Sequence, residues 1–167
     1  MDYKSVLMYN HASHNYNCPI CLAVQGIESD DTMIKQADIF YRDELVLGFI
    51  GSKFIKGHEG YPLLVPVNHI ENIYDLPINY GHRIMDMARD LSIALKLLRK
   101  CDGVKVIQNN EPAAGQHAFH YHLHIIPRFE GLEYNDKSEA IRVSRPEERI
   151  MYAQQLKEYF ASAVARR

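Results

Sequence analysis

The stretch GQHAFHYHLHIIPR, residues 115–128, carries a histidine at every second position of its central part. These histidines are His120, His122 and His124, and an apolar run follows them at once. Successive side chains of a β-strand point to opposite faces. The sequence therefore predicts a strand over 118–126 with the three imidazoles on one face, about 7 Å apart. The other face would pack on a helix through Tyr121, Leu123 and Ile125.

Three imidazoles on one face need a chemical explanation, because each carries a donor and an acceptor that must find partners. One interpretation is an exposed polar face that happens to use histidine. A second is a catalytic metal site, since alternating histidines on a strand can hold zinc. A third is a nucleophilic imidazole flanked by two that orient it, because neutral histidine can attack through one nitrogen while the other is held as a donor.

The remaining hydrophobic patterns predict an α+β domain. The expected elements, in chain order, are two strands within 39–51 joined by a turn at 42–44, a glycine-rich loop over 51–60, a strand over 61–67, a helix over about 79–100, a strand over 104–109, the histidine strand, and a helix from 146 onward. Pro62 and Pro66 indicate that the third strand lies near an edge or carries a bulge. This order predicts a mainly antiparallel five-stranded sheet with a long helix and a C-terminal helix.

The composition is that of an ordinary globular chain and argues against several kinds of partner. Of the 167 residues, 47% are hydrophobic and 24% are charged, and the formal net charge is −2. This balance does not suggest a nucleic-acid groove or an anionic membrane as partner. No apolar run approaches the roughly 20 residues of a membrane span, and the first residues lack a signal-peptide pattern. We therefore expect a cytoplasmic protein.

Cysteine use points to a metal rather than to a disulfide. The chain has three cysteines, Cys18, Cys21 and Cys101, and a structural disulfide is not expected in a reducing compartment. Cys101 stands alone near a helix end and suggests no role. The Cys18/Cys21 pair could be a redox pair, two inert buried thiols, or half of a zinc site. A redox pair would need a thioredoxin-like order of elements, which this chain lacks, and a zinc site would need two further ligands, often histidines.

The histidine strand and its surroundings resemble the histidine triad (HIT) superfamily, in the small Hint-like branch of bacterial HIT proteins. The resemblance rests on CPIC at 18–21, on LLVPVNHIENIYDLP at 63–77, and on ALKLLRKCDGVKVIQNNEPAAGQHAFHYHLHIIPR at 94–128. It covers about residues 18–128 and implies a HIT-like fold. The chain then divides into an N-terminal extension (1–17), a HIT domain (18–131) and a C-terminal helical extension (132–167).

The resemblance implies an enzyme that cleaves nucleoside phosphoramidates or dinucleoside polyphosphates at the α-phosphorus. His122 would be the nucleophile and would form a nucleotidyl-imidazole intermediate, with His124 beside the α-phosphate. Asn109 and Gln116 would contact the phosphate or the bridging atom. At His117 the relatives usually have a serine that helps to protonate the leaving group, so this histidine could serve as a general acid or could simply be exposed.

The resemblance also implies a zinc and a dimer. Some HIT proteins carry a structural zinc on ligands that correspond here to Cys18, Cys21, His69 and His120. His120 would then belong to the metal, which leaves His122 free for catalysis; a closed four-ligand site is structural rather than catalytic. A homodimer is implied as well, with contacts from the long helix and the strand near 103–109.

The loop after residue 49 departs from the family pattern. Relatives usually have a ribose-binding aspartate where this chain has Gly51, and Gly-His where it has Gly60 and Tyr61. Phe49 and Ile50 could still line a base pocket, or could be plain strand core. Two alternatives therefore stay open beside the hydrolase: a nucleotide-binding regulatory protein with little turnover, and a metal-dependent hydrolase that uses all three histidines as ligands.

Overall fold

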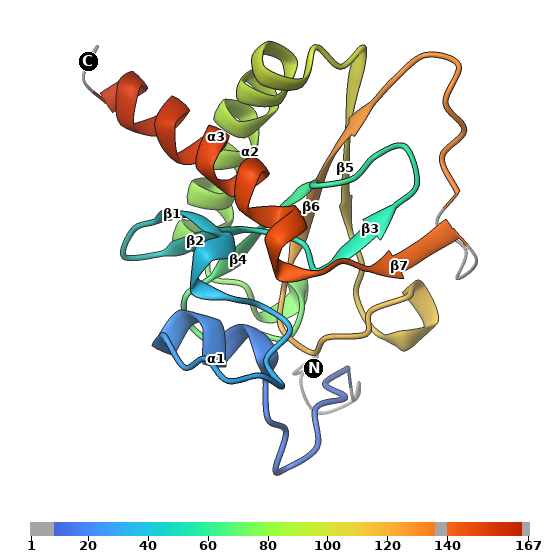
Figure 1. The fold of residues 1–167 in the computed structure, drawn as a ribbon. Coiled ribbons are helices and arrows are strands. Elements are labelled where there is room, and N and C mark those ends of the chain that lie inside the picture. Colours follow the sequence, from blue (N-terminus) through green and yellow to red (C-terminus); the bar gives the residue numbers. More distant parts are fainter. Residues whose placement is uncertain (1–8, 136–139, 165–167) are drawn as a thin grey trace.

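A five-stranded antiparallel sheet in the order β1-β2-β4-β6-β5 forms the centre of the structure (Figure 1). The computed structural model describes residues 9–135 and 140–164; the expected N-terminal and C-terminal extensions therefore lie partly outside the described residues. The strands are β1 Ile39–Arg42, β2 Val46–Ile50, β3 Lys53–Ile55, β4 Pro62–Pro66, β5 Gly103–Gln108, β6 Leu123–Arg128 and β7 Ile141–Val143. The α-helices are α1 Pro19–Gln25, α2 Ile78–Arg99 and α3 Pro146–Val164, and short 3-10 turns cover η2 Gln36–Asp38, η3 Ile73–Asp75 and η4 Pro112–Ala114.

The predicted fold class is confirmed, and so are the long and the C-terminal helices. One strand position was predicted wrongly: β4 lies between β2 and β6, at the centre of the sheet, and all of its residues are buried. Its prolines are the first and last strand residues, and β6 pairs only with Leu63 and Leu64 between them. Because the prolines stand outside the ladder with β6, their missing N–H groups cost no bond there.

The histidine strand begins later than predicted. β6 starts at Leu123, so only His124 lies in the strand and His120 and His122 precede it. The backbone before β6 makes other bonds: Tyr121 N donates to Ile70 O at 2.6 Å, and the residues before it form a tight turn. The expected strand over 118–126 is therefore wrong at its N-terminal end.

The sheet packs differently on its two faces. One face carries the larger hydrophobic cluster, in which Tyr121, Leu123 and Ile125 pack with the apolar stripe of α2, as the alternation predicted. The other face carries a second cluster, to which α1 contributes Ile20 and Ala23. Side chains at 124 and 126 point to this second face, because strand neighbours alternate.

The pattern of α2 explains both its position and its end. Its buried residues, spaced three and four apart along one stripe, are Tyr80, Ile84, Met87, Ala88, Leu91, Ala94 and Leu95. Such spacing gives a helix one apolar face for the sheet. The helix ends where Lys100 adopts a left-handed conformation with φ 49°, and Lys96 and Arg99 stand in the last turn, where cations favour the helix dipole.

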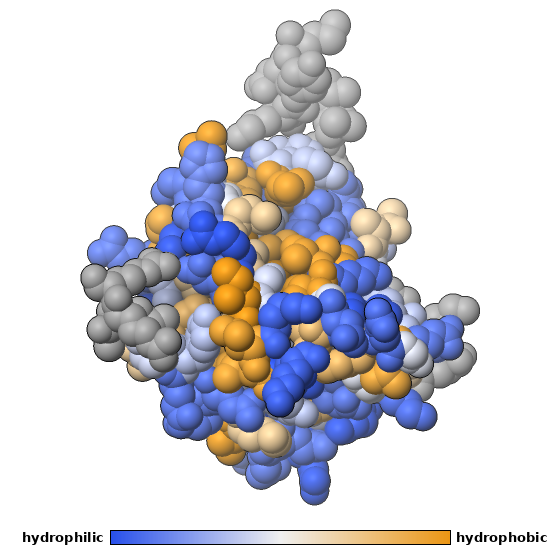
Figure 2. Space-filling view, turned by 90° about the horizontal axis from the view of Figure 1, so that it is seen from above, coloured by the Kyte–Doolittle hydropathy of each residue, from blue (hydrophilic) through white to orange (hydrophobic). Residues whose placement is uncertain are grey.

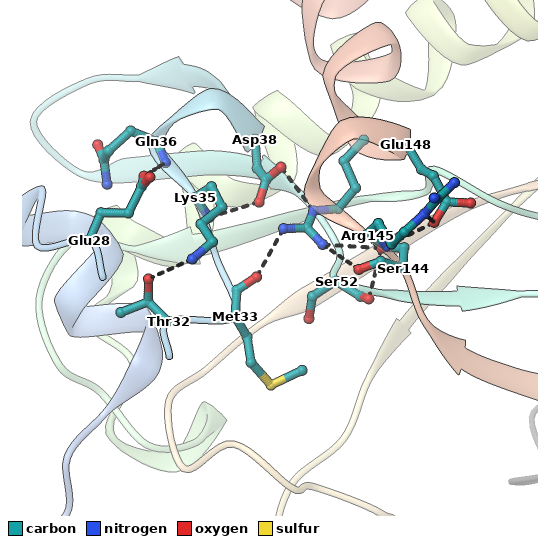
Figure 3. A network of polar contacts seen from close by, with 11 residues as sticks. Glu28, Thr32, Met33, Lys35, Gln36, Asp38, Ser52, Ser144, Arg145 and Glu148 are labelled. Carbon is teal, nitrogen blue, oxygen red and sulfur yellow. Dashed lines mark hydrogen bonds and ion pairs between the residues drawn. The ribbon is translucent and has the colours of Figure 1, made fainter. Parts of the chain in front are cut away.

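A buried ion pair attaches α3 to the segment before β1. The Arg149 Nε donates to Asp38 Oδ1 at 2.9 Å, and both residues are almost completely buried. The same guanidinium donates to the carbonyl oxygens of Ser144 and Met33, at 2.9 and 3.1 Å (Figure 3). The strands β3 and β7, which the sequence did not predict, pair beside this network as a second, two-stranded sheet.

The outer surface is mixed in polarity. Figure 2 shows, seen from above, hydrophobic residues exposed in a broken band among hydrophilic ones. The described part of the chain has no helix that is long and apolar enough to cross a membrane.

Candidate active site

Strand register places one histidine in a row of side chains across the second face of the sheet. Phe49 of β2 pairs with Leu63 of β4, Leu63 pairs with His124 of β6, and His124 pairs with Ile107 of β5. Directly paired residues point to the same face. These four side chains line the floor of a cavity of about 540 Å³.

His122 enters this cavity with a defined tautomer. Its Nδ1 lies 2.7 Å from the carbonyl oxygen of His120, which can only accept, so Nδ1 carries the proton. The Nε2 atom therefore keeps its lone pair. The side chain is 8% exposed and lines the cavity. Burial lowers the pKa of His122, which favours the neutral, nucleophilic form.

His124 stands beside it, also neutral. The centres of the two rings lie 5.0 Å apart in an edge-to-face arrangement, and the centre of the Tyr61 ring lies 5.7 Å from that of His124. Burial, and to a smaller extent His122, lower the pKa of His124 to about 3. The pair can therefore present neutral imidazoles to a phosphate at neutral pH.

Two more predicted residues reach the cavity from the loop between β5 and β6. Asn109 and His117 both line it, and His117 is exposed. The loop turns at Gly115, whose φ of 88° suits glycine. An amide and a third imidazole thus line the same cavity as His122.

The structure does not bring Gln116 to the cavity. Its side chain is 2% exposed and bridges two backbone segments: Oε1 accepts from Glu111 N at 2.7 Å, and Nε2 donates to Glu71 O at 2.6 Å. Both ends of the amide are therefore used in holding the loop. Nor does Ile50 line the cavity, because it lies on the opposite face of β2 from Phe49 and packs in the larger cluster.

The four predicted metal ligands do come together. Their Sγ and Nδ1 atoms all lie within 4.8 Å of one another. Among the described residues, no other group of three or more His, Cys, Asp or Glu side chains is close enough to hold a metal ion. Cys18 Sγ lies 3.4 Å from His120 Nδ1, and Cys21 Sγ lies 3.3 Å from His69 Nδ1. Tetrahedral zinc with bonds of about 2.0–2.3 Å separates its ligand atoms by about 3.3–3.8 Å.

Local structure prepares these ligands for a metal. Cys18 caps the N-terminus of α1, Pro19 follows in the first turn, and the helix places Cys21 one turn later. The His120 Nε2 lies 2.9 Å from the carbonyl oxygen of Pro66, so Nε2 carries the proton and Nδ1 faces the sulfurs. A hydrogen bond of this kind fixes the tautomer that a metal-binding histidine needs. The donor set therefore fits zinc.

Sequence reasoning missed several residues of the cavity wall. Tyr16 comes from the segment before α1, Met33 and Ile34 from the segment before β1, and Tyr134 and Ile141 from the C-terminal part. These residues carry no motif and lie far from the histidines in sequence. Only tertiary structure brings them to the site.

Comparison with known proteins agrees with this geometry. A family model described as the HIT domain matches residues 33–131, more than half of the chain. The chain belongs to the HIT family. This HIT protein is 36% identical over 118 residues to Protein hit of Bacillus subtilis, a match that covers 68% of this chain and 72% of that protein.

One further relative of this HIT protein matches it over part of its sequence, and another matches its fold over most of both chains. An adenosine 5′-monophosphoramidase of Saccharomyces cerevisiae is 36% identical over 70 residues, which is 42% of each chain. A zinc-bound histidine triad family protein from Mycobacterium smegmatis has a TM-score of 0.71 at 24% identity, over 90% of this chain and 98% of that one. At that identity the second likeness concerns the fold alone.

Proposed function

We propose that this HIT protein is a hydrolase that acts at the α-phosphate of nucleoside phosphoramidates or dinucleoside polyphosphates. The carrying observation is the unprotonated Nε2 of His122, buried at a cavity that also receives an amide and two more imidazoles. The Saccharomyces cerevisiae relative, named as a phosphoramidase, supports the same kind of reaction. A covalent intermediate on histidine would divide one difficult displacement into two easier ones.

In the first step, Nε2 of His122 attacks the α-phosphorus, and the bond from phosphorus to the leaving nitrogen or oxygen breaks. The departing group takes a proton, for which His117, on the loop that lines the cavity, is the candidate donor. The imidazole of His122 becomes positively charged, and the His120 carbonyl that accepts from Nδ1 stabilises this charge. Asn109 can donate to the phosphoryl oxygens.

In the second step, water attacks the same phosphorus. The bond to Nε2 breaks, a nucleoside monophosphate leaves, and His117 takes the water proton, which replaces the proton it gave to the leaving group in the first step. His122 regains its neutral form. In this scheme Gln116 acts through the loop that it braces, by its bonds to Glu111 and Glu71.

A nucleotide-binding regulatory role is the second candidate. It is favoured by one observation: none of the described residues that line the cavity is an aspartate or glutamate, and a carboxylate is the usual partner of ribose hydroxyls. A slow or absent turnover with tight nucleotide binding would favour this role over catalysis.

The test is turnover of adenosine 5′-phosphoramidate and diadenosine tetraphosphate by the parent and by His122→Ala. We expect AMP from the parent and at least about a thousandfold loss in the variant, which corresponds to roughly 4 kcal/mol of barrier. His82→Ala, which removes an exposed imidazole on α2, is the matched control. Unchanged turnover in His122→Ala would reject His122 as the nucleophile. A parent that binds these nucleotides but does not turn them over would favour the regulatory role.

We also propose that zinc binds to Cys18, Cys21, His69 and His120. When bound, zinc would act as a structural cross-link between α1 and the segments before η3 and β6. The zinc-bound relative of Mycobacterium smegmatis supports this proposal. Metal analysis of the purified protein should give about one zinc per chain and close to none in Cys18→Ala; near-zero zinc in both would reject it. If turnover survives the removal of weakly held metal, the histidine-nucleophile mechanism is favoured over a metal-dependent hydrolase that uses all three histidines as ligands.

The proposal includes a homodimer and a cytoplasmic location. All three cysteines are free in the structure, and thiols persist in a reducing compartment. The division into an extension over 1–17, a HIT domain over 18–131 and a helical extension over 132–167 remains part of the proposal.

A further inference from the structure

The cavity extends well beyond the histidines along the sheet. On β6, His124 and Ile126 point into it, and Arg128 follows on the same face. The cavity lining on β6 runs from His124 to Ile126, two residue steps or about 7 Å, and continues over Lys53 and Ile55 of β3. If the proposed reaction takes place at His122, this length is where the nucleoside part of the substrate lies.

Lys53 lies in the part of the cavity wall that β3 forms. Lys53 and Ile55 both line the cavity, because alternate residues of β3 face it, while Phe54 packs in the larger cluster. Within the part of the chain that the structure describes, the Lys53 side chain has no ion pair or hydrogen bond. Lys53 is also exposed, and no described side chain competes with a ligand for its ammonium group.

Two more cations contact Tyr134, another residue of the cavity wall. The Lys105 Nζ lies 4.0 Å from the centre of the Tyr134 ring, and the Arg128 Cζ lies 4.6 Å from it. Tyr134 itself lines the cavity. Of the three cations, only Lys53 lines the cavity itself.

The described lining of the cavity lacks the opposite charge. Apart from its imidazoles and the Lys53 ammonium, its described polar side chains are uncharged donors and acceptors such as Ser52 and Tyr61. Proteins that bind a free ribose diol usually offer a carboxylate to its hydroxyls, whereas those that bind a ribose phosphate offer a cation. The described lining offers a cation and no carboxylate, as expected for a site that binds a ribose phosphate.

We propose that this cavity is built for nucleotides that carry a second phosphate on the ribose, and that Lys53 is the residue that selects them. The proposal rests on the proposed function for the orientation of the nucleotide, with its 5′-phosphate at His122. It names the substrate class as 2′- or 3′-phosphorylated nucleoside 5′-phosphoryl compounds.

Gly51 provides a way to reverse this selectivity. A Cβ at Gly51 would lie 2.7 Å from Leu63 Cδ1 and 3.3 Å from Tyr61 Cε2, so the ends of these two side chains must move to make room for it. Its φ is not in the left-handed region. Aspartate at position 51 would therefore place a carboxylate two residues before Lys53 in the cavity wall, where it would accept from ribose hydroxyls and repel a ribose phosphate.

The experiment is calorimetric titration of the full chain with AMP, adenosine 2′,5′-bisphosphate and adenosine 3′,5′-bisphosphate. We expect one bisphosphate to bind at least about tenfold more tightly than AMP, since one charge-assisted hydrogen bond is of that order. Lys53→Gln should reduce this ratio to near one, and Lys53→Arg should keep it. Gly51→Asp should invert it, whereas Gly51→Ala controls for the added Cβ.

A charge control separates local from general effects. Lys157→Gln removes an exposed ammonium on α3, far from the cavity lining, and should keep the preference of the parent. Equal affinity of the parent for AMP and for both bisphosphates would overturn the proposal, and so would a preference that Lys53→Gln leaves intact. A bisphosphate preference in a chain that hydrolyses neither test substrate would support Lys53 selection and count only against the proposed reaction.

Discussion

His117 is the residue whose chemistry is most open to a direct test. It lines the cavity from an exposed loop position, so it can exchange protons with water between turnovers. General acid catalysis by a positioned side chain contributes about 10²–10⁴-fold. We expect His117→Ala to lower kcat by that order for a phosphoramidate, whose nitrogen must be protonated to leave.

The dependence on leaving group distinguishes this role from a structural one. A substrate with a good leaving group, such as a nitrophenyl ester of AMP, needs no proton, so His117→Ala should lose much less activity with it. An equal loss with both substrates would contradict the acid role. His117→Ser, which keeps a hydroxyl donor, should fall between the parent and His117→Ala with the phosphoramidate.

The second residue-scale prediction concerns pH and stability. The pKa of His124 is lowered from 6.5 to about 3 by burial and by the neighbouring His122. Between these values the unfolded chain binds a proton at this residue that the folded chain does not, so stability falls as pH decreases below about 6.5. The slope is at most about 1.4 kcal/mol per pH unit. Above pH 6.5 this contribution is constant.

Urea unfolding of the parent and of His124→Asn at pH 7, 6, 5 and 4.5 measures this difference. Tyr61 and His122, which face residue 124, and the other buried titratable groups are the same in both proteins. The difference between the two curves therefore reports on His124. The variant should therefore lose less stability than the parent between pH 6.5 and 4.5. Parallel curves would show that His124 does not cause the loss.

At the scale of elements, α3 depends on one buried ion pair. Arg149 is 1% exposed and Asp38 is 0% exposed, so neither charge has access to water when the partner is removed. Breaking a buried pair from one side typically costs about 3–5 kcal/mol. We expect Arg149→Met to lower the free energy of unfolding by that order, as measured by urea denaturation.

The double variant Asp38→Asn with Arg149→Met removes both charges. It should be more stable than Arg149→Met alone, because no unpaired carboxylate then stays buried. Arg145→Met removes an exposed guanidinium from the residue before α3 and should cost little. If Arg149→Met and Arg145→Met were equally stable, the ion pair would not be what attaches α3.

The elements also show which part of the fold the sequence could predict. Hydrophobic periodicity is local, so it located α2, α3 and the β1–β2 hairpin well. It failed for β3 and β7, which have three residues each and exist only because they pair with one another across more than 80 residues of chain. No pattern within three residues can predict such a pairing.

The candidate site was predictable to a similar extent. The alternation of histidines correctly separated the two faces, even though β6 begins only at Leu123. The metal cluster followed from motif resemblance. The orientation of Gln116 did not, because it depends on the path of the loop backbone and on the distant Glu71 carbonyl. The same is true of Tyr134 and Ile141, which tertiary packing alone brings to the cavity.

At the scale of the whole molecule, the exposed apolar side chains of α2 and β5 are consistent with the proposed dimer. On α2 they are Ile78, Met85, Ile93, Leu97 and Leu98, between 37% and 76% exposed. β5 is an edge strand, and Val106 on it is 45% exposed. Exposed apolar residues and an open strand edge are features that a second chain can cover.

Light scattering coupled to size exclusion tests this assembly. The parent should elute with about twice the 19.3 kDa mass of one chain. A charge at the strand edge, as in Val106→Lys, should shift it toward the monomer. Met151→Lys places the same charge at an exposed position on α3 and should leave the mass unchanged. A monomeric parent at micromolar concentration would contradict the dimer.

The account as a whole depends on a covalent bond from His122 to phosphorus. Rapid mixing of the protein with excess adenosine 5′-phosphoramidate, a quench in denaturant, and intact-mass spectrometry would detect that bond within the first turnover. We predict a species heavier by one adenylyl group in the parent, located at His122 by peptide mapping, and no such species in His122→Asn. AMP formation in the parent without any adenylylated chain, or with the group on another residue, would contradict the mechanism.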